Sequence, residues 1–459
     1  IGTVDDDDAP DGLGQHNSLA LDSDGHPHIA YYEADTQDLK YAAFDGTAWI
    51  SETVDSDGDV GQYASLALDS NGFPRISYYD GTHGDLKVAS FDGEAWGILH
   101  IVEDGDVGSH SSLALDAEDT LHVSYYDASS TALRYVRHSD TMHAEQTVDN
   151  TGDAGLFSSL ALRSDGQPCI AYVSTPDEVK CACSDGKTWV IDPVYDALGR
   201  PVSYTSLALT EDNRFHVAFH VGPSMTHMRY ALMYASLGGA GWVGETVDST
   251  GVVGQYASLD VDPAGEPHIS YYADGDLKIA YRYEDVWHTE VVDDDGNVGQ
   301  YTSLALDDSG QPHIAYHDVT NASLKHAFDV PLRFQHLAAQ LVAEMRGTGM
   351  ASGWDTAELG PGVRPMYRPD IEGVAYYEFP VEPTGFVIVS TGSHDFPIPH
   401  WDFASARPSY VLEKIAEEAG QSAERFFKLD TLAYACEDED RTLAGHLGAL
   451  PLKVTGLPP

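Results

Sequence analysis

Short stretches of alternating apolar and polar residues recur along residues 1–328 at a nearly constant interval. The segment Ser18-Leu19-Ala20-Leu21-Asp22 returns six times in similar form, with intervals of 47, 47, 47, 47, 52 and 45 residues between its serines. These serines are Ser18, Ser65, Ser112, Ser159, Ser206, Ser258 and Ser303. A period of about 45 to 50 residues is typical of one four-stranded propeller blade. The pattern therefore predicts an all-β, seven-bladed β-propeller.

Each unit reads as four short strands separated by turns. In the second unit the first three strands are expected at 65–68, 74–79 and 85–91, and the fourth from residue 95 onward. Turns at 69–72 and at Asp92-Gly93 separate them, with glycine where a positive φ is favoured. The strands are rich in β-branched and aromatic residues, and no helical period occurs before about residue 331.

The seventh unit contains only three predicted strands and ends near residues 325–328. The N-terminal segment Ile1-Gly2-Thr3-Val4-Asp5 matches the fourth-strand text at 53–55 and 246–248. We therefore expect the first strand to complete the last blade, which removes the exposed edge of an open array. The alternatives are an open solenoid, or a filament or swapped oligomer in which this strand is donated to a neighbouring subunit.

The repeated text is clearest at 253–272 and 298–316, where Val-Gly-Gln-Tyr leads into the Ser-Leu segment and later into Pro-His-Ile. It resembles a repeat of secreted bacterial and archaeal β-propeller proteins and, distantly, the sialidase-type (BNR, Asp-box) propellers and propeller polysaccharide lyases. The resemblance implies the fold and an extracellular location. Because propellers host many functions, it does not specify an activity.

The composition changes at residue 329, so we expect a propeller at 1–328 and a second domain at 329–459. A helical period at 333–346 and a second helix at 408–419, ended by Gly420, accompany predicted strands at 373–381, 385–391 and 425–436. This pattern predicts a small α+β domain. Residues 376–390 faintly resemble the propeptide or inhibitor module of streptopain-like cysteine peptidases. The apolar and aromatic content of the domain suggests docking to a partner or a neighbouring subunit.

The chain is strongly acidic, with 74 Asp and Glu against 24 Lys and Arg and a net charge of −50. Such a surface repels nucleic acids and anionic membranes, and no apolar run is long enough to span a bilayer. The start at Ile1 suggests either a removed signal peptide or a trimmed chain, and the first alternative agrees with a secreted or cell-surface protein. Of the 55 acids at 1–328, 43 are Asp, which favours turn chemistry as one cause of the charge; a saline habitat is the other explanation.

Acidic loops between the fourth strand of one unit and the first strand of the next place oxygen ligands at alternate positions around a glycine. Calcium takes six to eight oxygen ligands, so these loops are candidate Ca²⁺ sites. The candidate ligands are Asp55, Asp57, Asp59, Asp293, Asp295 and Asn297. The alternative is a solvated turn in which Asp binds its own backbone.

An aromatic or histidine residue precedes every predicted first strand, close to Gln15, Gln62, Gln255 and Gln300. The seven residues are His16, Tyr63, His110, Phe157, Tyr204, Tyr256 and Tyr301. First strands line the channel of a propeller, so these side chains are expected around one mouth of it, and all but Phe157 are our candidate ligand-binding residues. Aromatic faces next to polar anchors suit glycans. The alternative is packing between blades.

Other candidates occur on single strands. Cys169 lies on the second strand of unit four, and Cys181 and Cys183 lie on its third, so a disulfide between Cys169 and one of the other two is expected. A histidine recurs on the second strands of five units and is interpreted as structural. Unit five carries an insertion with His220, His227 and Arg229, which is where an active site would break the symmetry.

These observations predict a non-catalytic protein of extracellular binding, adhesion or assembly, with a glycan or protein as its partner. The near-uniform blades lack the asymmetric group of residues that catalysis needs. One alternative is a polysaccharide lyase or glycoside hydrolase acting at the channel mouth. The other is a filament subunit linked by exchange of the N-terminal strand.

Overall fold

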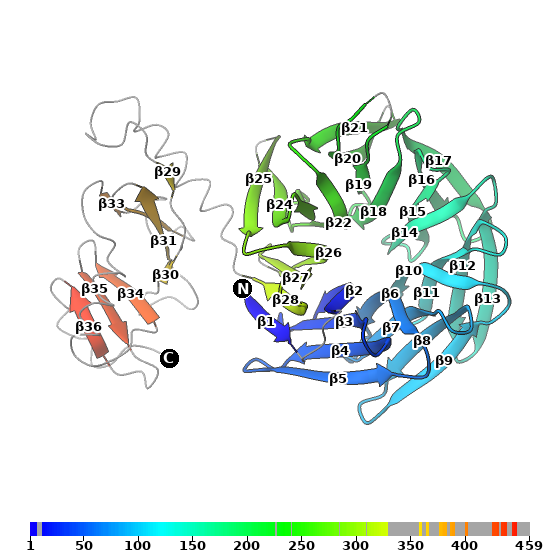
Figure 1. Cartoon of the computed structure of the whole chain (residues 1–459), viewed down its shortest axis with the longest axis horizontal. Coiled ribbons are helices and arrows are strands. Elements are labelled where there is room, and N and C mark those ends of the chain that lie inside the picture. Colours follow the sequence, from blue (N-terminus) through cyan, green and yellow to red (C-terminus); the bar gives the residue numbers. More distant parts are fainter. Residues whose placement is uncertain are drawn as a thin grey trace. The chain divides into compact units, whose positions relative to one another are not determined.

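The computed structural model describes residues 1–328, apart from 7–11, 225–226, 240, 284 and 309, together with eight short strands beyond residue 328. The chain divides into two compact units, 1–330 and 331–459. In the first unit, 28 strands form seven four-stranded antiparallel sheets around a central axis (Figure 1). The described residues contain no helix, and hence none able to cross a membrane. The predicted seven-bladed β-propeller is confirmed.

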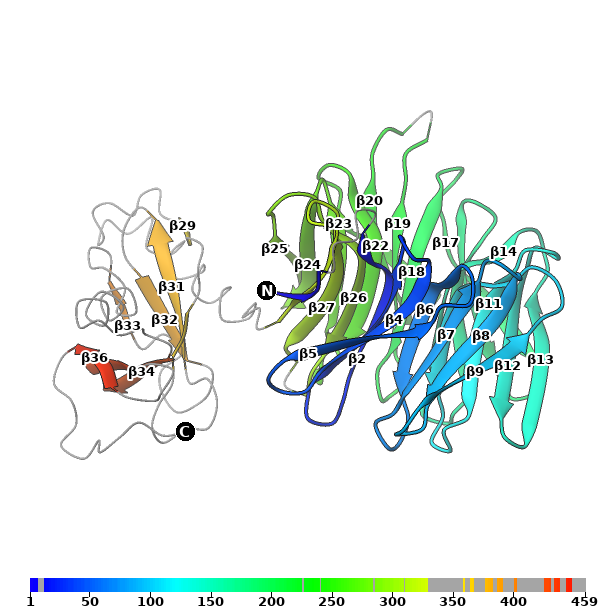
Figure 2. The same cartoon turned by 60° about the horizontal axis from the view of Figure 1, so that its bottom comes forward.

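Each blade runs outward from an innermost strand, here called strand A, through strands B and C to an outermost strand D (Figures 1 and 2). Blade one comprises β2 (Leu13–Leu21), β3 (Pro27–Glu33), β4 (Asp38–Phe44) and β5 (Trp49–Asp55). Blade two comprises β6 (Val60–Leu68), β7 (Pro74–Asp80), β8 (Asp85–Phe91) and β9 (Trp96–Val102). Blade three comprises β10 (Val107–Leu115), β11 (Leu121–Asp127), β12 (Ala132–Ser139) and β13 (Met142–Asp149). Blade four comprises β14 (Ala154–Leu162), β15 (Pro168–Ser174), β16 (Glu178–Ser184) and β17 (Trp189–Asp196).

The remaining blades follow the same order. Blade five comprises β18 (Val202–Leu209), β19 (Phe215–Val221), β20 (Ala231–Gly238) and β21 (Gly241–Asp248). Blade six comprises β22 (Val253–Val261), β23 (Pro267–Ala273), β24 (Asp276–Tyr283) and β25 (Val286–Asp293). Blade seven comprises β26 (Val298–Leu306), β27 (Pro312–Asp318), β28 (Ser323–Ala327) and β1 (Gly2–Asp5).

The N-terminal strand closes the propeller. β1 pairs antiparallel with β28, with Gly2 opposite His326 and Thr3 opposite Lys325. The closure predicted from the repeated text is therefore present within one chain. The first strand completes the chain's own last blade, so the edge that a donated strand would cover is already paired.

Beyond residue 328 the structure describes two antiparallel sheets. One contains β29 (Glu358–Leu359), β30 (Arg364–Met366), β31 (Tyr376–Glu382), β32 (Phe386–Ser390) and β33 (His400–Asp402). The other contains β34 (Arg425–Asp430), β35 (Ala433–Glu437) and β36 (Leu443–Leu447). The single strand expected at 425–436 is wrong, because the chain reverses there and forms a hairpin. The two predicted helices lie outside the described residues.

A serine hydroxyl joins every pair of adjacent blades. In each joint the repeated serine of strand A accepts a hydrogen bond from the backbone N–H of the leucine that follows the equivalent serine in the next blade. The oxygen–nitrogen distances are 2.9–3.0 Å, as in the bond from Leu113 to Ser65. Strand A has no strand partner on its inner edge, so this bond satisfies an N–H that would otherwise lack a partner in the sheet.

The glycine of the repeat permits close contact between blades. Gly61 has a φ of +106°, and a Cβ built on it would lie 2.8 Å from the Cα of Leu39 in the preceding blade. A side chain at this position would collide with the backbone, and a positive φ disfavours one in any case. Glycine holds this position in six of the seven blades, with Val202 in blade five, and lets strand A lie directly against strand C of the neighbouring blade.

A buried polar joint recurs between most blades. The Tyr78 hydroxyl on strand B donates to Asp55 at the end of the preceding strand D, at 2.6 Å. The Lys87 ammonium on strand C lies 3.4 Å from Asp55 and 2.7 Å from Asp80. Burial opposes ionisation of Asp80, but the hydrogen bonds from Lys87 and His83 hold its pKa below the usual value. Since Lys87 is only 3% exposed, the ion pair is largely shielded from water.

The same joint is built from equivalent residues at four other positions. Their aspartate, tyrosine and lysine triads are Asp5–Tyr31–Lys40, Asp149–Tyr172–Lys180, Asp248–Tyr271–Lys278 and Asp293–Tyr316–Lys325. These joints take up five of the six lysines at 1–328; the sixth, Lys187, is exposed. The scarcity of lysine thus reflects a propeller that keeps lysine chiefly where it is paired between blades.

The joint between blades four and five has an apolar version of this arrangement. Tyr195, Phe219, Val221 and Met233 occupy the positions of Asp55, Tyr78, Asp80 and Lys87, and the rings of Tyr195 and Phe219 lie 5.1 Å apart. All four polar residues are replaced together. Replacing only one member of an ion pair would instead leave its buried partner without a counter-charge.

Aspartate also serves the turns. Asp69 accepts backbone N–H bonds from Asn71 and Phe73, and Asp92 accepts them from Glu94 and Ala95. Equivalent bonds recur at other blades, so much of the aspartate excess is turn chemistry.

We expect Ser65→Ala to lower the free energy of unfolding by about 1 kcal/mol, because the Leu113 N–H loses its acceptor. Urea denaturation of the full chain measures the change. Ser51→Ala, at an exposed strand D position, is the control and should change the value by less than about 0.5 kcal/mol. Equal losses in both variants would contradict the role given to the joint serine.

We expect Lys87→Met alone to destabilise the protein by about 3 kcal/mol, because it leaves buried carboxylates without their cation. The fourfold variant D55Y/Y78F/D80V/K87M copies the apolar joint and should regain most of that loss. Thermal and urea unfolding of both variants test this. A fourfold variant less stable than the single one would show that the joints are not interchangeable.

Candidate functional site

The sequence predicted that the seven aromatic positions precede strand A. In the structure they lie within it. In blade two, strand A begins at Val60, and its pairing with β7 is irregular between Gln62 and Ser65. Tyr63 sits in this irregularity with a φ of +55°. All seven equivalents have φ between +50° and +55°, a conformation that costs a non-glycine residue about 1–2 kcal/mol. The distorted backbone turns each aromatic side chain toward the channel.

The seven side chains form a closed ring, which we call the channel ring. Each contacts both neighbours, with centroid distances of 4.4–5.0 Å. The circuit is His16, Tyr63, His110, Phe157, Tyr204, Tyr256, Tyr301 and back to His16. The ring does pack blade against blade, which was the alternative interpretation. It does so around the axis, at the end of the channel near the D-to-A loops.

Neighbouring planes of the channel ring meet at 44–56°, close to one seventh of a turn, about 51°. Ring planes that are related by this rotation about the channel axis are parallel to that axis. Side chains facing the axis would collide edge to edge at these centroid distances. They therefore lie face against neighbouring face, with ring edges rather than ring faces toward the axis. This differs from the stacking platform that the sequence suggested.

The polar tips of the channel ring fall into two groups. Hydrogen bonds link the hydroxyl of Tyr256 to those of Tyr204 and Tyr301. By contrast, the structure gives the side chains of His16, Tyr63 and His110 no hydrogen bond to another described residue.

Burial lowers the pKa of His16 to about 4, and burial together with the charge of His16 lowers the pKa of His110 to about 3. Both imidazoles are therefore neutral near pH 7.

A second layer of side chains surrounds the channel ring. Tyr32, Tyr79 and Tyr126 on strands B contact His16, Tyr63 and His110 edge-on, at 6.3–6.5 Å between centroids. Their hydroxyls donate to Asp59, Asp106 and Asp153 in the D-to-A loops, at 2.6–2.8 Å. Tyr272 likewise donates to Asn297, at 3.0 Å. The mouth thus has aromatic walls and a rim of carboxylate and amide oxygens.

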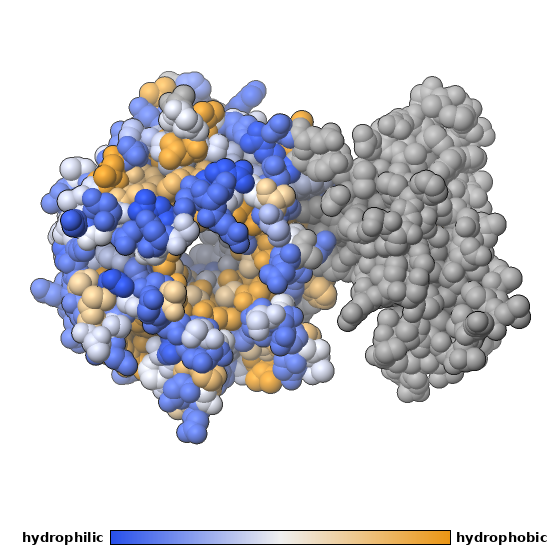
Figure 3. Space-filling view, turned by 180° about the vertical axis from the view of Figure 1, so that it is seen from behind, coloured by the Kyte–Doolittle hydropathy of each residue, from blue (hydrophilic) through white to orange (hydrophobic). Residues whose placement is uncertain are grey.

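A cavity of about 210 Å³ lies at the channel ring. The ring and the residue that follows each of its members line it. Several of these following residues donate their hydroxyls to the backbone carbonyl of the ring member in the preceding blade. Examples are the bonds from Ser111 to Tyr63, from Ser158 to His110 and from Thr205 to Phe157. The face of the propeller seen from behind is hollowed at its centre (Figure 3).

The predicted calcium ligands are distributed over different contacts. Asp55 and Asp293 turn one oxygen into the blade joints, toward Tyr78 and Tyr316, and the other toward the backbone of their own loops. Asp59 and Asn297 accept from rim tyrosines, whereas Asp57 and Asp295 are exposed. Among the described residues, the groups with three clustered ligand atoms are Asp22–Asp24–His26 and Asp85–His100–Glu103, not these loops. Calcium binding stays a prediction.

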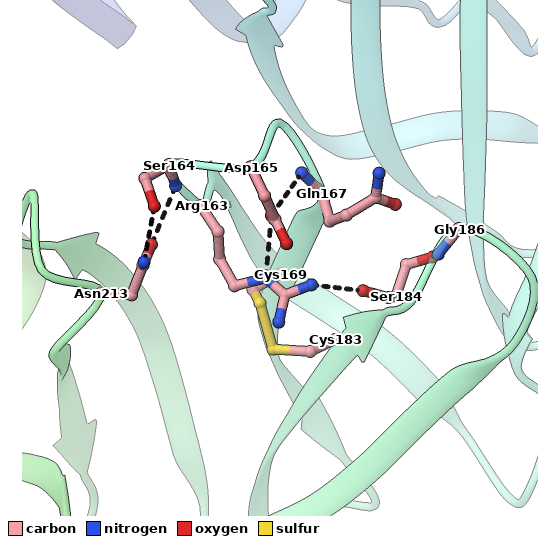
Figure 4. Close-up of a disulfide and its surroundings, with 9 residues drawn as sticks. All are labelled: Arg163, Ser164, Asp165, Gln167, Cys169, Cys183, Ser184, Gly186 and Asn213. Carbon is pink, nitrogen blue, oxygen red and sulfur yellow. Dashed lines mark hydrogen bonds and ion pairs between the residues drawn. A yellow bond between two sulfur atoms is a disulfide. The ribbon is translucent and has the colours of Figure 1, made fainter.

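Cys169 forms a disulfide with Cys183, which lies directly opposite on the neighbouring strand. Figure 4 shows Arg163 beside this bond, donating to the carbonyl of Ser184 at 2.8 Å. Cys181 is a free, buried thiol, and burial raises its pKa to about 12. Of the two pairings left open by the sequence, the structure contains the one with Cys183.

The strand B histidines have structural contacts in the described blades. His122 lies between Tyr135, at 2.6 Å, and Asp116, at 3.1 Å. His220 in blade five contacts Tyr204 of the channel ring and hydrogen-bonds Ser203 at 2.9 Å, while His227 and Arg229 are exposed. The insertion therefore brings one of its three candidate residues to the mouth.

Sequence reasoning missed the rim. Four residues before each ring member stand Gly12, Asp59, Asp106, Asp153, Arg200, Val252 and Asn297. The sequence does contain a signal for these residues, because this position varies from blade to blade within an otherwise uniform repeat. It was obscured because Asp59 and Asn297 were themselves assigned to calcium, and the acidic residues beside this position were assigned to turns or to calcium.

Comparison with known proteins supports the fold alone. No family model matches the chain, and no curated protein matches its sequence. Among solved structures, an ulvan lyase described as a new family of polysaccharide lyase has a TM-score of 0.52 and 12% identity, covering 72% of this chain and 95% of the lyase. AofleA from Arthrobotrys oligospora (TM-score 0.43, 13% identity, 62% and 88% covered) and the SapL1 lectin in complex with α-methyl fucoside (0.43, 12%, 62% and 98%) are also similar. The resemblance to sialidase-type propellers stays a prediction.

In a regular strand a glycine substitution is more destabilising than an alanine substitution. At the ring positions, which have a positive φ, we expect the opposite order. At Tyr63, with φ +55°, the glycine variant should be about 1 kcal/mol more stable than the alanine variant. At Tyr79, in the regular strand β7, the alanine variant should be more stable than the glycine variant by about 0.5–1 kcal/mol. Urea unfolding of the four variants gives both differences. The same sign at the two positions would contradict the strain.

Proposed function

We propose that the propeller binds a carbohydrate at the mouth of its central channel and does not convert it chemically. The observation that carries the proposal is the channel ring, in which seven aromatic residues hold a costly backbone conformation around one cavity. Such strain tends to cluster at ligand sites, where the surrounding structure enforces it. Apolar walls next to convergent polar groups are the composition that sugars require.

The titration of the histidines favours binding over catalysis. A general base works best with a pKa near the working pH. The pKa values of His16 and His110 lie near 4 and 3, and burial together with Arg200 also lowers that of His220 to about 4. These imidazoles are suited to accepting hydrogen bonds rather than abstracting protons. A polysaccharide lyase or glycoside hydrolase is the alternative, and the ulvan lyase shares the fold.

We further propose that the protein works outside the cell and that residues 329–459 dock it to a partner. The disulfide between Cys169 and Cys183 supports an oxidising compartment. A net charge of −50 repels nucleic acids, so the partner proposed here is a glycan or a protein. Exchange of the N-terminal strand is not part of the proposal, because β1 completes its own chain's blade.

A glycan panel followed by isothermal titration calorimetry of the full chain tests the proposal. We expect one glycan bound per propeller, since a single axis carries the channel ring. Tyr63→Gly should weaken binding by at least about tenfold, through loss of one ring member and its hydroxyl.

Phe73→Ala is the control, because Phe73 packs against Phe91 at the A-to-B and C-to-D turns, away from the channel ring, and the change should leave affinity unaltered. Absence of glycan binding, or binding insensitive to Tyr63→Gly, would contradict the proposal. An unsaturated product that absorbs in the ultraviolet would instead identify a lyase.

A further inference from the structure

The mouth of the channel is chemically polarised, although the blades repeat. On blades one to three, each ring member is followed outward by a tyrosine and then by a carboxylate. These three columns are His16–Tyr32–Asp59, Tyr63–Tyr79–Asp106 and His110–Tyr126–Asp153. Their members contact one another directly, so each column is a continuous path from the axis to the rim.

The other four blades carry no such column. Arg200 holds the rim position of blade five, and its guanidinium donates to the carbonyls of Gly222 and Arg229. Val252, Asn297 and Gly12 hold the remaining rim positions. The carboxylates of this layer are therefore confined to one side of the mouth.

A second, independent observation falls on the same side. His16, Tyr63 and His110 are the three ring members whose polar tips have no hydrogen bond to another described residue. All three line the cavity. On the opposite side the hydroxyl of Tyr256 is hydrogen-bonded to those of Tyr204 and Tyr301. Groups that can accept a hydrogen bond and the rim carboxylates therefore lie on the same side of the mouth. This arrangement suits a ligand that carries hydrogen-bond donors.

We propose that this side of the mouth binds a protonated amino group of the ligand, so that the glycan is an amino sugar with a free amine. This inference rests on the proposed glycan binding and specifies its class. An ammonium group has three N–H donors, and two neutral imidazoles and a phenol oxygen provide three acceptors. The three carboxylates behind them supply the compensating negative charge.

The electrostatic field of the whole propeller also favours a cationic ligand. Residues 1–328 carry 55 acidic and 14 basic residues, a net charge of −41. A cationic ligand is attracted to such a surface, and a uronic acid or sulfated sugar is repelled. Neither His16 nor His110 offsets this near pH 7, because burial keeps both neutral.

An organic cation fits this site better than a metal ion. Asp59, Asp106 and Asp153 lie on three different loops, and each already accepts a tyrosine hydroxyl. Within the described part of the chain, they do not form a group of three clustered ligand atoms. A hard divalent cation needs six or more oxygens at close range. A dispersed set of acceptors suits a ligand that brings its own ring and hydroxyl groups.

The test compares two ligands that differ only in acetylation, a glucosamine hexamer and an N-acetylglucosamine hexamer, titrated into the full chain by calorimetry. We expect the glucosamine hexamer to bind more tightly, and its advantage to fall as the pH rises through the pKa of its amines. In D59N/D106N/D153N the affinity for the glucosamine hexamer should fall at least about tenfold. The affinity for the acetylated hexamer should change by less than about twofold.

The variant is designed to preserve the fold. Asparagine keeps the oxygen that accepts the tyrosine hydroxyl, as Asn297 does with Tyr272 in the native chain. The control D24N/E94Q/E118Q removes the same charge from exposed turns at the other end of the strands. It should leave both affinities unchanged, which separates the local site from the general field.

The outcomes separate this inference from the proposed function. Equal or tighter binding of the acetylated hexamer, or equal losses in the rim variant and the control, overturns the amine specificity and leaves glycan binding intact. If no glycan binds at all, both fail together. If only a lysine-rich peptide binds, the mouth recognises a protein amine and the glycan assignment is overturned.

Discussion

The hydrogen bond from a leucine N–H to the serine of the preceding blade is the contact on which the architecture depends. It occurs in all seven joints and holds the innermost strands at a common distance from the axis. Gly61 and its equivalents in five other blades leave room for the close approach of adjacent blades beside this bond. A circuit of identical bonds fixes seven irregular strands in register, and the channel ring is the result. The same bonds therefore hold the blades together and position the residues of the candidate site.

The sequence was sufficient to predict the blades and their closure. The serine spacing gave the number of blades, and the match between Thr3-Val4-Asp5 and the text at 53–55 gave the closing strand. It was not sufficient to predict the orientation of the ring. Tyr63 was expected before strand A, whereas an irregular pairing carries it inside the strand at a positive φ. Such irregularities arise from contacts between blades, which no local pattern contains.

The candidate site illustrates the same limit. Asp55 and Asp59 stand four residues apart in one acidic loop, and their spacing suggested a shared ion. In the structure Asp55 turns into the joint toward Tyr78, and Asp59 turns to the rim toward Tyr32. Which way a carboxylate points depends on the neighbouring blade. Similarly, the uniform repeat suggested a symmetric mouth. Four of its seven rim positions, however, hold Arg200, Val252, Asn297 and Gly12 instead of a carboxylate, so the rim carboxylates lie on one side only.

The placement of lysine has a practical meaning for handling the protein. Five of the six propeller lysines are engaged between blades, and Lys187 stands alone on the exposed turn between β16 and β17. That turn lies at the end of the strands opposite the D-to-A loops and the channel ring. Among the lysine side chains of the propeller, an amine-reactive dye would therefore reach chiefly Lys187, at the end of the blades opposite the mouth of the channel.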